Sequence, residues 1–330
     1  MIARRRLVAA LLACAACAPV AVAQAAGPPL PSTDSGRVGA VAPGGTERLV
    51  AVPFGAGTLV TAFARDGDRP LRSRQIAGRW SVAPVALDGA TTGLSADGRT
   101  LVLVRPTRSF PPADTRLAVV DVRTLRLRRE IALRGFFTVD AIAPDGGRVY
   151  LVQYPRPDDV LDYRVRALDT GTGRLAARDV VDPRSPGEQM GGLPMTRATS
   201  ADGRWVYTLY GGGDETFIHA LDTVGATAAC IDLDMLPPDG DLAGLQLHVS
   251  PGGRTIAVRG GGTLVATVDA RTFAVREPAT AAGRADAAGP DPDDGGFPWA
   301  VLLLAAAGAL AALAVLARWR GGPLTATRAR

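Results

Sequence analysis

Short apolar runs follow tight, Gly-containing turns at five places along the chain. The clearest is SADGRTLVLV, residues 95–104, in which a Gly-centred turn precedes a strand-like apolar run. Variants of this segment begin at residues 42, 95, 143, 200 and 250, so that successive starts lie 53, 48, 57 and 50 residues apart. Such regular spacing indicates repeated units that bury their apolar faces by stacking on their neighbours.

A second marker has the same period. Each unit contains a later apolar run that stops at an aspartate: Asp66, Asp121, Asp169, Asp222 and Asp269. Within a unit the pattern predicts four antiparallel strands separated by Gly, Asp and Pro turns. Four such strands every 40 to 50 residues are typical of a β-propeller blade. We therefore predict an all-β propeller over residues 35–277 with five blades, or six if residues 79–88 supply further strands.

Composition agrees with a turn-rich β domain and limits the partners. The 330 residues are 47% hydrophobic and include 39 Gly and 25 Pro. The formal charge is +5, but seven of the 37 basic residues, all arginines, lie in the first six and last thirteen positions, where no acidic residue occurs. The rest of the chain contains 30 basic and 32 acidic residues. A near-neutral body lacks the basic footprint of a nucleic-acid binder, so we expect no nucleic-acid partner.

Residues 1–26 have the features of a secretory signal. A basic start precedes a short apolar run and small residues near the expected cleavage site. Two alternatives stay open. Leu-Leu-Ala-Cys ending at Cys14 resembles a lipoprotein signal, in which Cys14 would carry lipid, and the segment could also remain uncleaved.

The other end of the chain predicts a membrane anchor. Residues 278–296 are rich in Pro, Gly and Asp and predict a flexible linker. Residues 297–317 form an uncharged, apolar stretch long enough to cross a bilayer as one helix. The Arg-rich tail, residues 318–330, predicts a cytoplasmic C-terminus. We thus expect a single-pass protein of the cell membrane with its body outside, and a monomer.

Residue counts argue against several chemistries. Cys230 is the one cysteine outside the signal segment, and its apolar setting favours an inert buried thiol. His219 and His248 are the only histidines, and both fall inside predicted strands. Too few ligands are present for a typical zinc site, and no GxSxG motif supports a serine nucleophile. We predict no catalytic residues, no metal and no cofactor.

Two candidate ligand sites follow from the repeat. The strand before each Gly turn is expected to line the propeller channel, and Asp140 and Arg197 occupy equivalent positions there on adjacent blades. They either neutralise each other in a salt bridge or anchor a polar ligand. The second candidate is the long insertion at residues 182–195, where Glu188 and Met190 could form a contact patch. An ordinary ordered loop is the alternative.

The turn and strand motif resembles a known group of repeats. The pattern [SA]-[AP]-D-G-R-x-[LV]-[YV]-[LV], followed by a strand ending in D-T or D-x-x-T, is similar to that of extracytoplasmic YVTN-type, WD40-like β-propellers, including membrane-tethered bacterial ones. Lactonase-like and quinoprotein-like propellers are more distant members of this group. The chain departs from the pattern at Gly44 and Gly252, which replace the motif's Asp in the outer units.

The resemblance implies a fold rather than an activity, and two function classes remain. The first is a non-enzymatic recognition or scaffold module, held at the cell surface by one C-terminal span, that binds a protein, peptide or glycan. The alternative is a lactonase-like hydrolase that holds a divalent metal with channel carboxylates. The shortage of metal ligands favours the first class.

Overall fold

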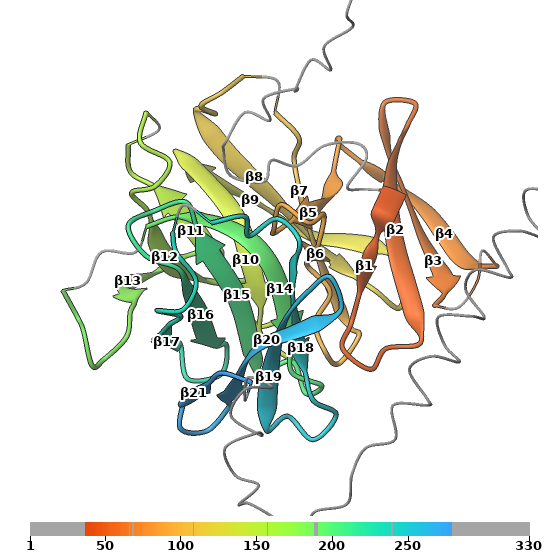
Figure 1. Cartoon of the computed structure of the whole chain (residues 1–330). Helices are drawn as coiled ribbons and strands as arrows, with labels where there is room; N and C mark the ends of the chain where they lie inside the picture. Colours follow the sequence, from red (N-terminus) through yellow and green to blue (C-terminus); the bar gives the residue numbers. More distant parts are fainter. Residues whose placement is uncertain are drawn as a thin grey trace, which may run out of the picture. The chain divides into compact units, whose positions relative to one another are not determined.

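The computed structural model describes residues 37–278, except positions 66, 68, 108, 157, 188–190 and 239 (Figure 1). Contacts divide the chain into Met1–Pro278 and Ala279–Arg330, and every described residue belongs to the first unit. The predicted signal segment, membrane span and Arg-rich tail lie outside the described residues, as does all of the linker but its first residue. Within the part that is described, no helix is long and apolar enough to cross a membrane.

Five antiparallel sheets follow one another along the chain, coloured from orange to blue in Figure 1. The first contains β1 (Ala40–Val41), β2 (Glu47–Phe54), β3 (Gly57–Ala64) and β4 (Pro70–Ala77). The second contains β5 (Ser81–Pro84), β6 (Thr91–Thr92), β7 (Thr100–Val104), β8 (Asp114–Asp121) and β9 (Arg126–Arg134). The third contains β10 (Phe136–Ile142), β11 (Arg148–Tyr154), β12 (Arg164–Asp169) and β13 (Leu175–Val180). The fourth contains β14 (Leu193–Thr199), β15 (Trp205–Gly211), β16 (Phe217–Asp222) and β17 (Thr227–Asp232). The fifth contains β18 (Leu245–Val249), β19 (Thr255–Gly260), β20 (Thr263–Asp269) and β21 (Val275–Arg276).

Side-chain hydrogen bonds close the Gly turns that precede β7, β11, β15 and β19. Between β14 and β15, Asp202 Oδ1 accepts hydrogen bonds from Ser200 Oγ at 2.6 Å and from the backbone N of Arg204 at 3.0 Å. Gly203 follows with φ of +73°, a left-handed conformation that glycine adopts without strain. These contacts are local, which explains why the turn is visible in the sequence.

The aspartates that end the third strands hold the next turn. Asp169 Oδ1 accepts hydrogen bonds from the backbone N and the Oγ1 of Thr172, and Asp269 does the same with Thr272. These hydrogen bonds favour the carboxylate and lower the pKa of both aspartates. The second repeated marker is therefore structural, a turn in which an Asp side chain binds backbone N–H groups.

Middle strands are apolar on both faces because each inner sheet lies between two others. In β7, Leu101 and Leu103 join the core cluster with the first sheet, whereas Val102 and Val104 join the cluster with the third. Side chains alternate across a strand, so the continuous run TLVLV serves two cores. Further clusters join the third sheet to the fourth and the fourth to the fifth.

Five consecutive four- or five-stranded antiparallel sheets that pack face to face define a β-propeller arrangement. Residues 79–88, which prompted the six-bladed alternative, contribute β5 to the second sheet and no sheet of their own. No core cluster of the described residues joins the fifth sheet to the first. Closure of the ring between these two sheets therefore stays a prediction.

Candidate functional site

Asp140 and Arg197 form a buried ion pair between the first strands of the third and fourth sheets. Arg197 Nη2 donates to Asp140 Oδ1 at 2.8 Å, and Nη1 donates to the backbone carbonyl of Asp140. The side chain of Arg197 is 5% exposed and that of Asp140 is 4% exposed. Asp140 lies where the β10–β11 register shifts, and such a bulge redirects a side chain. The pairing expected from the repeat is present, and the role of these residues in ligand binding stays a prediction.

Arg197 also lines a cavity, and its place in a propeller channel stays a prediction. Arg197 lines a cavity of about 220 Å³ together with Thr92, which occupies the equivalent position in the second sheet. Glu188 and Met190, the other predicted contact residues, lie outside the described residues. Their loop begins beside Asp182, whose carboxylate binds the side chain of Arg184 and the backbone N of Cys230.

His219 is a second buried polar group near this pair. It lies in β16, is 1% exposed, and its Nε2 has no hydrogen-bond partner among the described residues. Burial lowers the pKa of the imidazole because a low-dielectric interior disfavours the charged form, and the negative charge of Asp140 opposes this only in part. The structure thus places His219 as a packed strand residue, as the sequence predicts.

We expect acid to destabilise the protein through His219. Its pKa lies below that of the unfolded chain, so the unfolded state binds more protons once the pH falls below about 6.5. The free energy of unfolding should then decrease between pH 7 and pH 5, by at most about 1.4 kcal/mol per pH unit from this group. Urea midpoints at pH 7, 6 and 5 measure the effect. In the His219→Phe variant the decrease should be smaller, and an unchanged profile would contradict the assignment.

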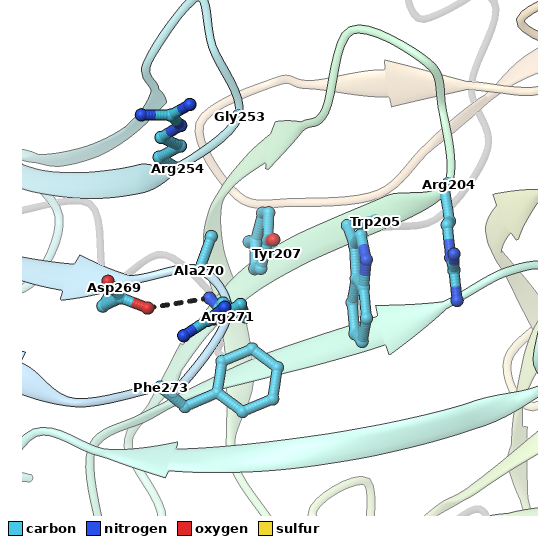
Figure 2. Close-up of a pocket in the computed structure, with 9 residues that line it drawn as sticks. All are labelled: Arg204, Trp205, Tyr207, Gly253, Arg254, Asp269, Ala270, Arg271 and Phe273. Atoms are coloured by element: carbon cyan, nitrogen blue, oxygen red, sulfur yellow. Dashed lines mark hydrogen bonds between the residues drawn. The ribbon is translucent and has the colours of Figure 1, made fainter.

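A groove of about 840 Å³ lies between turns of the fourth and fifth sheets (Figure 2). The start of β15 contributes Trp205 and Tyr207, and Arg204 directly precedes the strand. The remaining lining residues come from the β18–β19 and β20–β21 turns and are Gly253, Arg254, Asp269, Ala270, Arg271 and Phe273. Sheet packing therefore builds the groove from segments that are far apart in the chain.

Aromatic rings form one part of the groove. The Trp205 ring is nearly parallel to that of Tyr207, with centroids 6.3 Å apart, and meets the Phe273 ring edge-on at 5.7 Å. The Arg204 guanidinium lies 5.8 Å from the indole centroid, so that Trp205 stands between Arg204 and the other two rings (Figure 2). Trp205 and Phe273 are half-buried and pack on the core between the two sheets.

Arginine side chains supply the charge. Arg204 forms a double hydrogen bond with Asp222, at 2.7 and 3.1 Å, which raises the pKa of the guanidinium. Arg254 and Arg271 differ, since their side chains have no hydrogen-bond or ion-pair partner among the described residues. The groove is lined by three arginines and one aspartate, and with Asp222, which is bound to Arg204, the local charge is +1.

None of the groove residues was predicted as a ligand-binding residue from the sequence. One signal was available: Trp205 stands in a repeat position that is Thr100 in the second sheet and Thr255 in the fifth. A large aromatic residue at a position where other units carry threonine indicates a contact that is specific to this unit. Its partners Arg271 and Phe273 lie in another unit and become visible only in the folded chain.

Metal ligands do not converge in the described part of the structure. No group of three or more His, Cys, Asp or Glu side chains there could hold a metal ion. The carboxylate on which a metal-dependent alternative would rely, Asp140, is bound to Arg197.

Comparisons with known proteins give distant structural likenesses and no family. No family model and no curated protein matches the sequence. Among solved structures, the chain is similar to a functionally unknown protein from Desulfotomaculum acetoxidans, with 15% identity over 72% of this chain and 67% of that one and a TM-score of 0.46. The β-propeller domain of Cps50 (Swd1) from Myceliophteria thermophila shows 10% identity over 70% and 64%, with a TM-score of 0.41. TolB from Acinetobacter baumannii shows 14% identity over 70% and 51%, with a TM-score of 0.42.

The described part of this chain is a β-propeller module. Because the likenesses have low identities and TM-scores below 0.5, the sheet topology and the packing of successive sheets carry this assignment.

Proposed function

We propose that the chain is a non-enzymatic recognition module that binds its ligand in the groove between the fourth and fifth sheets. The observation that carries this proposal is the combination of two half-buried aromatic rings, Trp205 and Phe273, with the guanidinium groups of Arg254 and Arg271, which form no hydrogen bond or ion pair within the described part of the chain.

This combination suits binding for two physical reasons. Trp and Phe provide a large contact area with few rotatable bonds, so that little entropy is lost when a ligand packs on them. Arginine offers up to five N–H donors in a fixed plane and fits carboxylate or phosphate groups in pairs of hydrogen bonds. The volume of about 840 Å³ lies within the usual range of ligand sites, about 300 to 1,000 Å³.

The proposal includes a place in the cell. Residues 1–26 have the pattern of a secretory signal, and residues 297–317 that of a membrane span followed by an Arg-rich tail. Export of the body and retention by the C-terminal segment would hold the groove outside the cytoplasmic membrane, where it meets extracytoplasmic ligands.

Spheroplasts that produce the full chain test both the groove as the binding site and its location outside the cytoplasmic membrane. They are incubated with a library of fluorescent, membrane-impermeant oligosaccharides and acidic peptides, and bound label is measured by flow cytometry. We expect binding of at least one probe, lost when external protease removes the body. The Phe273→Gly variant should lose about tenfold in affinity, because it removes a ring from the groove.

Glycine suits the backbone conformation at position 273. Phe273 has a left-handed φ of +59°, and Gly173 occupies the same place in the turn of the third sheet. Lysed cells serve as the control for orientation: binding only after lysis would refute the extracytoplasmic placement. Equal binding by Phe273→Gly would refute the groove as the site.

A further inference from the structure

The geometry points to an acidic saccharide as the ligand of the groove. We propose that Gly252, which stands where other turns of the repeat carry Asp, leaves the charge of Arg254 without a nearby turn carboxylate, so that Arg254 and the neighbouring Arg271 can bind the carboxylate or phosphate groups of this ligand. This inference rests on the function proposed above and specifies the chemistry of the ligand.

The turns can be compared residue by residue. In the second and fourth sheets the turn carboxylate belongs to Asp97 and Asp202, and each accepts a hydrogen bond from the backbone N of the arginine two positions later. In the fifth sheet that arginine is Arg254, and its backbone N donates to Ser250 Oγ at 3.2 Å instead. Ser250 therefore keeps the turn closed while Gly252 contributes no charge.

The missing carboxylate changes the electrostatics of the groove. In the fourth sheet, Asp222 binds the guanidinium of Arg204 and is the main cause of its raised pKa, to which the charge of Asp202 adds. Arg254 has no such partner among the described residues. The remaining aspartate of the groove, Asp269, accepts a hydrogen bond from the backbone N of Arg271 (Figure 2). It also accepts hydrogen bonds from the backbone N and the Oγ1 of Thr272. Among the described residues no carboxylate is hydrogen-bonded to the guanidinium of Arg254 or Arg271, although the charge of Arg271 helps to lower the pKa of Asp269.

The aromatic residues indicate what the anion is attached to. The electron-rich face of an aromatic ring attracts the C–H groups of a sugar, whose aliphatic face carries partial positive charge, and Trp205 and Phe273 supply such rings in the groove. Cations beside such a surface match a sugar that bears an acidic substituent. A nucleic acid also combines rings with anions, but the near-neutral body of the chain lacks the extended basic surface that nucleic-acid binders have.

Gly252 offers a direct test because it tolerates a side chain. A Cβ built at this position meets no atom within 4 Å, and its φ is not left-handed, unlike that of the following Gly253. The substitution Gly252→Asp therefore restores the residue that the repeat uses elsewhere, and the turn is expected to fold as it does at Asp202.

The experiment measures binding to the full-length protein in detergent by isothermal titration calorimetry. The probes are trigalacturonate, a phosphorylated maltotriose, neutral maltotriose and a hexaglutamate peptide. We expect the two acidic saccharides to bind more tightly than the neutral one and the peptide, and the tighter of the two identifies the acidic group. Gly252→Asp should weaken acidic-saccharide binding about threefold, because it adds one nearby negative charge. Combined Arg254→Ala and Arg271→Ala should weaken it about tenfold or more.

Matched controls separate charge from shape. Gly252→Ala adds a Cβ without charge, and Arg99→Ala removes the equivalent, exposed arginine of the second sheet. Both should bind as the original chain does, and unchanged melting temperatures would show that every variant is folded. Equal binding of hexaglutamate, or acidic-saccharide binding that Gly252→Asp leaves unchanged, would overturn the inference. Binding of neutral maltotriose alone, lost in Phe273→Gly, would overturn it while leaving the proposed recognition function intact.

Discussion

Replacing Arg197 with Met should reduce the free energy of unfolding by about 3 to 5 kcal/mol. The substitution leaves the Asp140 carboxylate, 4% exposed, without its ion partner in the interior between the third and fourth sheets. Asp140→Leu should be similarly costly, because it leaves the guanidinium uncompensated. Urea-induced unfolding followed by circular dichroism measures both changes.

The double variant separates the cost of an unpaired charge from the worth of the pair. With Asp140→Leu and Arg197→Met together, no buried charge remains, and we expect stability close to that of the original chain or above it. As an exposed control, Asp114→Asn removes an ion pair with Arg116, half-exposed on both sides, and should cost less than about 1 kcal/mol. Single variants at 140 and 197 that behave like this control would contradict the buried-pair assignment.

Substituting Trp80 with Ala should destabilise the protein by about 3 to 5 kcal/mol. Trp80 is 1% exposed and belongs to the core cluster between the first and second sheets. Its Nε1 donates to the carbonyl of Ala77 at 2.7 Å, its backbone N donates to Thr58 Oγ1, and the Arg105 guanidinium lies 4.9 Å from the ring. Removal of the ring leaves a cavity where two sheets meet.

Trp80→Phe is the matched variant for this position. It keeps most of the ring volume and loses the hydrogen bond to Ala77, so it should cost considerably less than Trp80→Ala. Thermal and urea unfolding of both variants give the comparison. A loss below about 1 kcal/mol for Trp80→Ala would show that the first and second sheets do not depend on this contact.

The candidate sites differ in how far the sequence predicted them. Asp140 and Arg197 could be paired in advance, because the repeat assigns them equivalent positions and equivalent positions on adjacent blades lie close together. The groove could not be predicted in this way, because Trp205 and Phe273 belong to different units and occupy non-equivalent positions in them. The replacement of Asp by Gly252 was visible as an irregularity, but its effect on charge depends on Arg271, which another turn brings into the groove.

By itself, the sequence determined the strands, the turns and their repetition. These features depend on contacts within a few residues: Asp and Ser side chains that bind nearby backbone N–H groups, glycines that adopt left-handed conformations, and side chains that alternate along a strand. The tertiary structure decided which faces meet and what lies at their edges, because the packing of one sheet on the next sets the distance between side chains that the chain order leaves far apart. Arg204 and Arg271 line one groove for that reason.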